Sequence, residues 1–347
     1  MVSSDLEIYE SLNFPLCPFP FLQMEHMGVT EKENQTAITE FILLGFGDFH
    51  EMQPLLFVIF LFIYTITMSG NIVIVLVIAA DHNLHTPMYF FLGNLSFLEI
   101  CYITTIVPKM LRSFLTVREV ILFMGCVAQL YIFGSLAVSE CLLLSVMSYD
   151  RYLTICHPLS YASIMNFKVC LQLAAGCWIT GFLTPIAMMV LTFMLPFCAS
   201  KEVGHFFCHF MPLLKLSCTD THLVEFLSFT VSACVTLVPF LLILTSYYKI
   251  ILTIQRIPST TGKQKASFTC SSHLPVVSIF YGTVIIVYVA PAGNQSPALN
   301  EAYSLLYTVI SPMFNPLIYS LRNKEVNGAL RKVGSKVFTF LKKSNIP

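Results

Sequence analysis

Long apolar segments separated by short polar ones dominate the chain. Seven windows of about 18 or more residues carry almost no charge. The first is PLLFVIFLFIYTITMSGNIVIVLVIAA, residues 54–80, and the others cover roughly 88–108, 122–149, 169–195, 226–252, 267–291 and 303–321. As a helix, each is long enough to cross ~30 Å of hydrocarbon. The pattern predicts seven membrane-spanning helices.

The composition agrees with a lipid environment. Hydrophobic residues make up 56% of the chain and charged residues 11%, against roughly 45–50% and 25% in soluble domains. The connections between the windows are too short to hold a soluble domain. We therefore predict an all-α membrane protein, in which residues 54–321 form one seven-transmembrane helix bundle between the tails 1–53 and 322–347.

The basic residues predict the orientation of this bundle. With the N-terminus outside, thirteen of the 19 lysines and arginines fall on the cytoplasmic side, as the positive-inside rule requires. Residues 1–53 are then an extracellular tail and 322–347 a cytoplasmic one. In the latter, apolar positions from Val326 to Val337 alternate with basic residues, which favours a short amphipathic helix on the inner leaflet. The zero net charge gives no reason to expect a nucleic acid partner.

The predicted outer side carries candidate modification sites. Asn34 begins an N-x-T acceptor for glycosylation in the N-terminal tail. Cys126, Cys198, Cys208 and Cys218 also fall outside, where disulfides persist, and they allow three pairings. Fixing the longest loop over the bundle would require a bond to a helix end, and Cys126 is the available anchor. His205, Cys208 and His209 have metal-ligand side chains, but Cys208 is better used in a disulfide.

Six motifs then appear in order, each at the end of a predicted span. They are GN (70–71), LHTPMYFFL (84–92), MSYDRYLTICHPLSY (147–161), SY (246–247), KASFTCSSH (265–273) and PMFNPLIYSLRN (312–323). With these motifs the chain resembles an olfactory receptor of the rhodopsin-like G-protein-coupled receptor family, of the tetrapod type (class II). The resemblance runs from about Met27 to Lys343. Residues 1–26 have no counterpart in it, so Met27 is an alternative start.

The resemblance implies a receptor, not an enzyme, and no cofactor. It implies that a small volatile odorant activates the chain, which raises cyclic AMP through an olfactory stimulatory G protein. The expected location is the plasma membrane of sensory cilia, with receptor-transporting chaperones as further partners. It also implies the disulfides Cys126–Cys208 and Cys198–Cys218. The alternative function is a non-olfactory chemosensory receptor of the same family for a small apolar metabolite.

The cytoplasmic end of the third span carries the expected switch. Asp150 and Arg151 stand side by side where the chain leaves the hydrocarbon. The permanently charged arginine can pair with the aspartate at rest and reach the carbonyls of a partner helix when the bundle opens. An ordinary boundary ion pair is the alternative reading. By resemblance, Tyr152 and Tyr247 join these two residues in G-protein coupling.

The resemblance places the ligand on the inner faces of spans three, five and six. The expected lining is mostly apolar, contains no cation and suits a volatile apolar or weakly polar molecule. For each residue taken singly, bundle packing is the alternative role. The expected residues are Phe133, Gly134, Ala137, Val138, Val231, Val235, Tyr281, Val284, Ile285 and Tyr288.

Two acids lie deep in the predicted membrane. Glu99 follows Met88 by eleven residues and Glu140 precedes Arg151 by eleven, so at 1.5 Å per residue both lie ~16 Å deep. Asn71 and Asn315 reach a similar depth and complete a polar layer. In related receptors the position matching Glu99 helps to bind sodium, so the glutamates are expected either to hold a sodium ion or to share one proton.

Other classes of membrane protein fit less well. A transporter favours paired repeats with broken helices, and neither half of this sequence mirrors the other. A membrane enzyme needs a nucleophile with a base, or a metal cluster, and the spans, with their single histidine His273 and two glutamates, offer neither.

Overall fold

A computed structural model describes residues 39–44, 52–116, 119–197, 201–271, 273–288 and 303–322, with a few single residues between 326 and 331. Five of its helices are long and apolar enough to cross a membrane. These are α1 (Gln53–Ala80), α2 (Pro87–Ser113), α3 (Phe123–Cys156), α5 (Phe167–Phe193) and α7 (His222–Arg256). They correspond to the first five predicted spans, although α3 and α7 extend several residues further toward the cytoplasm.

The structure describes only parts of the last two predicted spans, because residue 272 and residues 289–302 lie outside the described residues. The sixth corresponds to α8 (Thr260–Ser271) and α9 (His273–Tyr288), and the seventh to the π-helix η4 (Leu306–Ile310) and α11 (Ser311–Arg322). Most of the predicted amphipathic tail helix lies outside the described residues. Short elements lie between the long helices: η2 (His82–Leu84), α4 (Tyr161–Ile164) and α6 (Phe210–Leu214).

Local sequence signals explain where several helices begin. A proline stands in the first turn of both α1 and α2, where its missing N–H is not needed and its fixed φ suits a helix. Before α5, the side chain of Asn166 accepts a hydrogen bond from the Val169 N–H at 3.1 Å. This cap satisfies one of the first free N–H groups of the helix.

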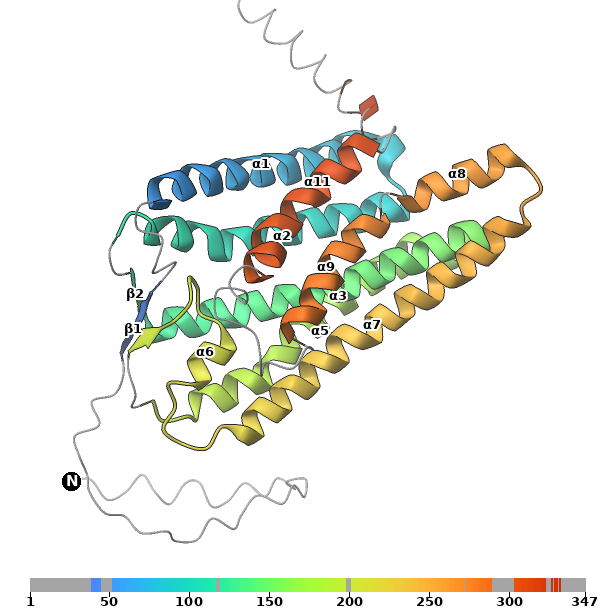
Figure 1. Cartoon of the computed structure of the whole chain (residues 1–347). Helices are drawn as coiled ribbons and strands as arrows, with labels where there is room; N and C mark the ends of the chain where they lie inside the picture. The colour runs from blue at the N-terminus through green and yellow to red at the C-terminus, as the bar shows by residue number, and fades with distance from the viewer. Residues whose placement is uncertain are drawn as a thin grey trace, which may run out of the picture. The chain divides into compact units, whose positions relative to one another are not determined.

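Helix α3 is the centre of the bundle, with α2, α5 and α7 packed against it (Figure 1). Sixteen of its residues are buried, in keeping with contacts on several sides. Gly181 of α5 lies so near to α3 that a side-chain carbon there would lie 2.8 Å from the backbone oxygen of Ser135. The glycine therefore sets the distance between these two helices.

A three-stranded sheet, in the order β2–β1–β3, lies at the end of the bundle near α6 (Figure 1). Strand β1 (Glu40–Leu43) pairs antiparallel with β2 (Glu119–Leu122) and parallel with β3 (Glu202–Val203). A small separate core beneath it contains Phe41, Cys126, Val203, Cys208 and Leu213. The end of the N-terminal tail is thus the central strand, between the first and second outer loops.

Candidate functional site

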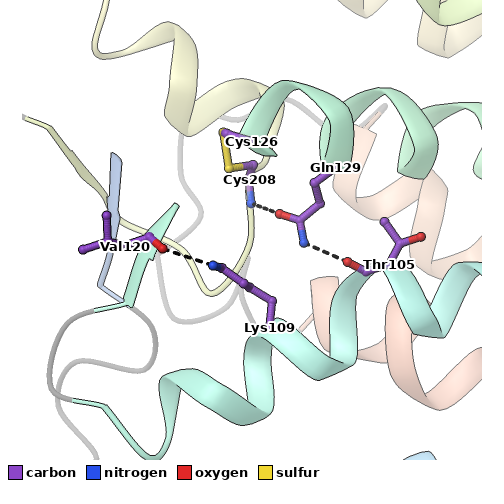
Figure 2. The surroundings of a disulfide bond; sticks show 6 residues. All are labelled: Thr105, Lys109, Val120, Cys126, Gln129 and Cys208. Atoms are coloured by element: carbon purple, nitrogen blue, oxygen red, sulfur yellow. Dashed lines mark hydrogen bonds between the residues drawn. A yellow bond between two sulfur atoms is a disulfide. The ribbon is translucent and has the colours of Figure 1, made fainter. Parts of the chain in front are cut away.

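The second outer loop is fastened to α3 by the disulfide between Cys126 and Cys208 (Figure 2). This confirms the expected pairing. Next to it, the side chain of Gln129 accepts a hydrogen bond from the Cys208 N–H at 3.1 Å and donates one to the Thr105 carbonyl at 3.0 Å. One amide therefore joins the loop to α2 and α3. Because Gln129 is only 7% exposed, water does not compete for these two hydrogen bonds.

A charged brace holds the first outer loop in place. The Lys109 ammonium lies 2.8 Å from a carboxylate oxygen of Glu119. It also donates a hydrogen bond to the Val120 carbonyl at 3.1 Å, which Figure 2 shows. Arg112 lies 3.4 Å from the other oxygen of Glu119. Because Glu119 is only 3% exposed, its charge needs these partners.

A cavity of about 560 Å³ lies beneath the loops, within the size range of ligand pockets. Helices α3, α5 and α7 and the second outer loop form most of its wall, and α2, α9 and the seventh span contribute the remaining residues. Seven of the ten predicted ligand-binding residues line it: Phe133, Gly134, Ala137, Val138, Val231, Val235 and Val284. Their contact with an odorant stays a prediction.

Two predicted ligand-binding residues, Tyr281 and Ile285, are not among the described residues that line the cavity. The Tyr281 hydroxyl donates a hydrogen bond to the Cys141 carbonyl at 2.8 Å, and its ring stacks on Phe240. The tyrosine therefore joins α9 to α3. The side chain of Tyr288 lies outside the described residues.

The cavity also has wall residues that the sequence did not predict. The loops supply His205, His209 and Lys215, α5 supplies Met188 and Met189, and α7 supplies Glu225. The expectation of a wall without a cation is wrong, because Lys215 lines the cavity. That expectation considered only the helices and not the outer loops. It is exposed, so water can solvate its charge.

The two histidines face each other with nearly parallel rings, 5.5 Å between centroids. Burial lowers the pKa of His209 to about 4, and burial together with the neighbouring His209 lowers the pKa of His205 well below its ordinary value. Both rings are therefore uncharged at neutral pH. No group of three or more metal-ligating side chains occurs in the part of the chain that the structure describes.

The predicted polar layer is assembled inside the bundle. Asn71, Glu99, Glu140 and Asn315 are all at most 2% exposed. The Asn315 amide donates a hydrogen bond to Glu99, the carboxyl groups of Glu99 and Glu140 interact, and the Asn71 amide donates to the Pro312 carbonyl at 3.4 Å. These contacts bring helices α1, α2, α3 and α11 together.

At the cytoplasmic end the Arg151 guanidinium pairs with the Asp150 carboxylate at 3.0 Å, and Arg151 is only 7% exposed. The Tyr161 hydroxyl donates to the other Asp150 oxygen at 2.8 Å. Burial, and then the Asp150 charge, raises the pKa of Tyr161, so this donor keeps its proton. The Arg151 guanidinium is thus paired with Asp150 and buried from the solvent.

The two tyrosines predicted to take part in coupling lie near this pair. Tyr247 forms a 2.7 Å hydrogen bond with His273, and Tyr152 forms a 2.9 Å hydrogen bond with His157. The Lys249 ammonium also lies 5.4 Å from the centre of the Tyr152 ring, a cation–π distance. Both tyrosines are engaged within the resting bundle.

Two predicted sites involve residues outside the described part. Asn34, the glycosylation acceptor, lies there, and so does Cys198. Cys218 takes part in a disulfide, but its predicted pairing with Cys198 stays a prediction.

Comparison with known proteins agrees with this architecture. The family model described as "Olfactory receptor" matches residues 60–336. Human olfactory receptor 10A7 is 51% identical over 86% of this chain and 95% of its own length. Human olfactory receptor 5G3 is 47% identical over 87% and 96%, and mouse olfactory receptor 5G9 is 45% identical over 89% and 99%. The chain therefore belongs to the olfactory receptor family: it is a multi-pass receptor of the plasma membrane that senses odorants and couples to a G protein, and it is not an enzyme.

Proposed function

We propose that a small, volatile, apolar or weakly polar odorant binds in the cavity beneath the outer loops, and that the receptor then raises cyclic AMP through a stimulatory G protein. The observation that carries this proposal is the cavity of about 560 Å³, whose walls are predominantly apolar side chains of α3, α5, α7 and α9. Such a space buries most of a small ligand and orients it with a few polar groups.

The closed cytoplasmic end supports the coupling mechanism. A partner helix can reach the Arg151 guanidinium only when α3 and its neighbours separate, because the arginine is now buried against Asp150. Once free, its five donors suit the carbonyl end of a helix. Tyr247 and Tyr152 must exchange their present partners, His273 and His157, in the same opening.

The polar layer supports a bound sodium ion or a shared proton. Five buried side-chain oxygens of Asn71, Glu99, Glu140 and Asn315 have no hydrogen-bond partner among the described residues. Oxygen ligands of this kind suit a hard cation, and two interacting carboxylates in a low dielectric resist carrying two uncompensated charges. The residues present therefore fit such an ion, which would neutralise the pair without a covalent step.

Delivery to the cell surface is a further part of the proposal. We propose that receptor-transporting chaperones assist it and that sensory cilia are the destination, because the chain shares most of its length with olfactory receptors.

The test is a panel of volatile compounds applied to cells that express the full chain, with cyclic AMP as the readout. We expect at least one compound to raise cyclic AMP in a concentration-dependent way. Cells that lack stimulatory G-protein α subunits serve as the control and should not respond. A response that persists in those cells would contradict the proposed coupling.

A further inference from the structure

His205 lies in the roof of the cavity, and the backbone on both sides of it is fixed. Before it, the Val203 carbonyl in β3 accepts hydrogen bonds from the N–H groups of Leu44 at 3.1 Å and of His205 itself at 2.8 Å. After it, Cys208 is bonded to Cys126 and donates its N–H to Gln129. The imidazole is therefore presented to the cavity from a rigid position.

This imidazole is buried and forms no hydrogen bond within the described part of the chain. His205 is 5% exposed, and its ring contacts Phe206 and Phe207 at centroid distances of 4.4 and 4.7 Å. Its Nδ1 atom has no partner, and its ring takes part in none of the hydrogen bonds of the described residues. Buried polar side chains in folded proteins nearly always have a partner. Because His205 lines the cavity, a ligand bound there can supply the missing partner.

Three other polar groups in the wall already have a partner or contact with water. The Thr184 hydroxyl donates to the Thr180 carbonyl at 2.7 Å, and the Glu225 carboxylate accepts from the Thr221 hydroxyl at 2.7 Å. Lys215 is exposed and can keep its hydration. His205 differs from these three groups because its buried imidazole forms no hydrogen bond within the described residues.

We propose that His205 is the hydrogen-bonding anchor of the odorant, and that this odorant carries one uncharged oxygen, as a hydroxyl or a carbonyl group, on an apolar body. The inference rests on the proposed function and specifies its ligand class. A neutral imidazole has one donor and one acceptor nitrogen, so it can donate to a carbonyl oxygen or exchange both kinds of bond with a hydroxyl.

The charge of the ring distinguishes this class from acids. Burial lowers the pKa of His205 well below its ordinary value, and the adjacent His209 is uncharged for the same reason. An uncharged roof offers no counter-ion to a carboxylate, whose burial without one is costly. The alternative for acids is Lys215, which the test below includes.

The first arm of the test varies the ligand and leaves the receptor unchanged. Each straight-chain or monoterpene skeleton is tested in four forms: the hydrocarbon, the alcohol, the ketone or aldehyde, and the carboxylate. Cyclic AMP is measured for each form. We expect the alcohol or carbonyl form to act at about tenfold lower concentration than the hydrocarbon of the same skeleton. Equal potency of the hydrocarbon, or strongest action of the carboxylate, would refute the anchor but leave the receptor function intact. A panel without any response would overturn the proposed function, and the anchor with it.

The second arm varies the receptor at matched surface level. His205→Leu should raise the half-maximal concentration of the oxygen-bearing compound about tenfold and leave a responding hydrocarbon unchanged. His205→Gln, which keeps a donor and an acceptor, should restore part of the loss. His222→Leu, at an exposed histidine that does not line the cavity, should have no effect. A larger loss with Lys215→Gln than with His205→Leu would make the lysine the anchor instead. Loss of the response on adding a metal chelator would reassign the two histidines to a metal ion. If the His205 variants do not reach the surface, the ligand series alone decides.

Discussion

The contact between α3 and α5 allows a sharp test of packing through Gly181→Ala. The added methyl carbon would overlap the Ser139 hydroxyl oxygen and would lie 2.8 Å from the Ser135 carbonyl oxygen. The hydroxyl can rotate away, but the backbone oxygen cannot, so the two helices must move apart. Rotation also breaks the hydrogen bond that Ser139 makes to the Cys177 carbonyl of α5 at 3.4 Å.

The expected loss of stability has two parts. Overpacking of a tight interior contact costs about 1–3 kcal/mol, and an interhelical hydrogen bond in a membrane is worth about 0.6 kcal/mol. A change of 1.4 kcal/mol already alters a folding equilibrium about tenfold. We therefore expect Gly181→Ala to lower both the thermal midpoint in detergent and the amount of receptor at the cell surface.

Gly176→Ala is the matched control on the same helix. A methyl group there meets nothing within 4 Å, so its thermal midpoint and surface staining should equal or slightly exceed those of the natural protein. If Gly181→Ala and Gly176→Ala behave alike in both assays, Gly181 does not set the distance between α3 and α5.

Three further changes test other parts of the receptor. Arg151→Ala should abolish odorant-evoked cyclic AMP but leave surface staining measurable, with exposed Lys168→Ala as the control that still signals; full signalling by the arginine variant would refute the switch. Cys208→Ser should prevent surface delivery because it frees the second outer loop. Glu99→Gln combined with Glu140→Gln should give non-additive shifts in basal cyclic AMP, since interacting residues respond as a unit; additive shifts would show two independent residues.

The membrane spans could be predicted because a single physical signal, long segments without charge, governs them. Within the described residues, five of the seven segments form helices that cover nearly the predicted residues. The π-helix Leu306–Ile310 was not predicted, because nothing in LYTVI distinguishes it from an α-helix. Such details depend on packing against neighbours and not on hydropathy.

The lining of the cavity could be predicted only in part, because some of it depends on tertiary packing. The spacing of Phe133, Gly134 and Ala137 marks one helix face, and that face does line the cavity. Tyr281 looked equally suitable, yet the rotation of α9 directs its hydroxyl to Cys141. The sequence indicates His205 only as a metal-ligand side chain, because burial without a partner cannot be read from residue letters.

The sheet could not be predicted from its strands. EFIL, EVIL and the dipeptide EV are too short to indicate strands by alternation. Their pairing depends on the folded bundle, on the disulfide between Cys126 and Cys208 and on the brace at Glu119, which bring the outer loops together.

The order of the strands has a consequence for biosynthesis. Strand β1 is made first, but its partners β2 and β3 emerge from the ribosome only after two and four long helices, respectively, have been made. The central strand must therefore wait outside the membrane without its hydrogen bonds while the helices insert. Because β3 leads directly to Cys208, closure of the sheet and oxidation of that cysteine belong to the same late step. A completed sheet consequently marks a chain whose second outer loop has already been translocated.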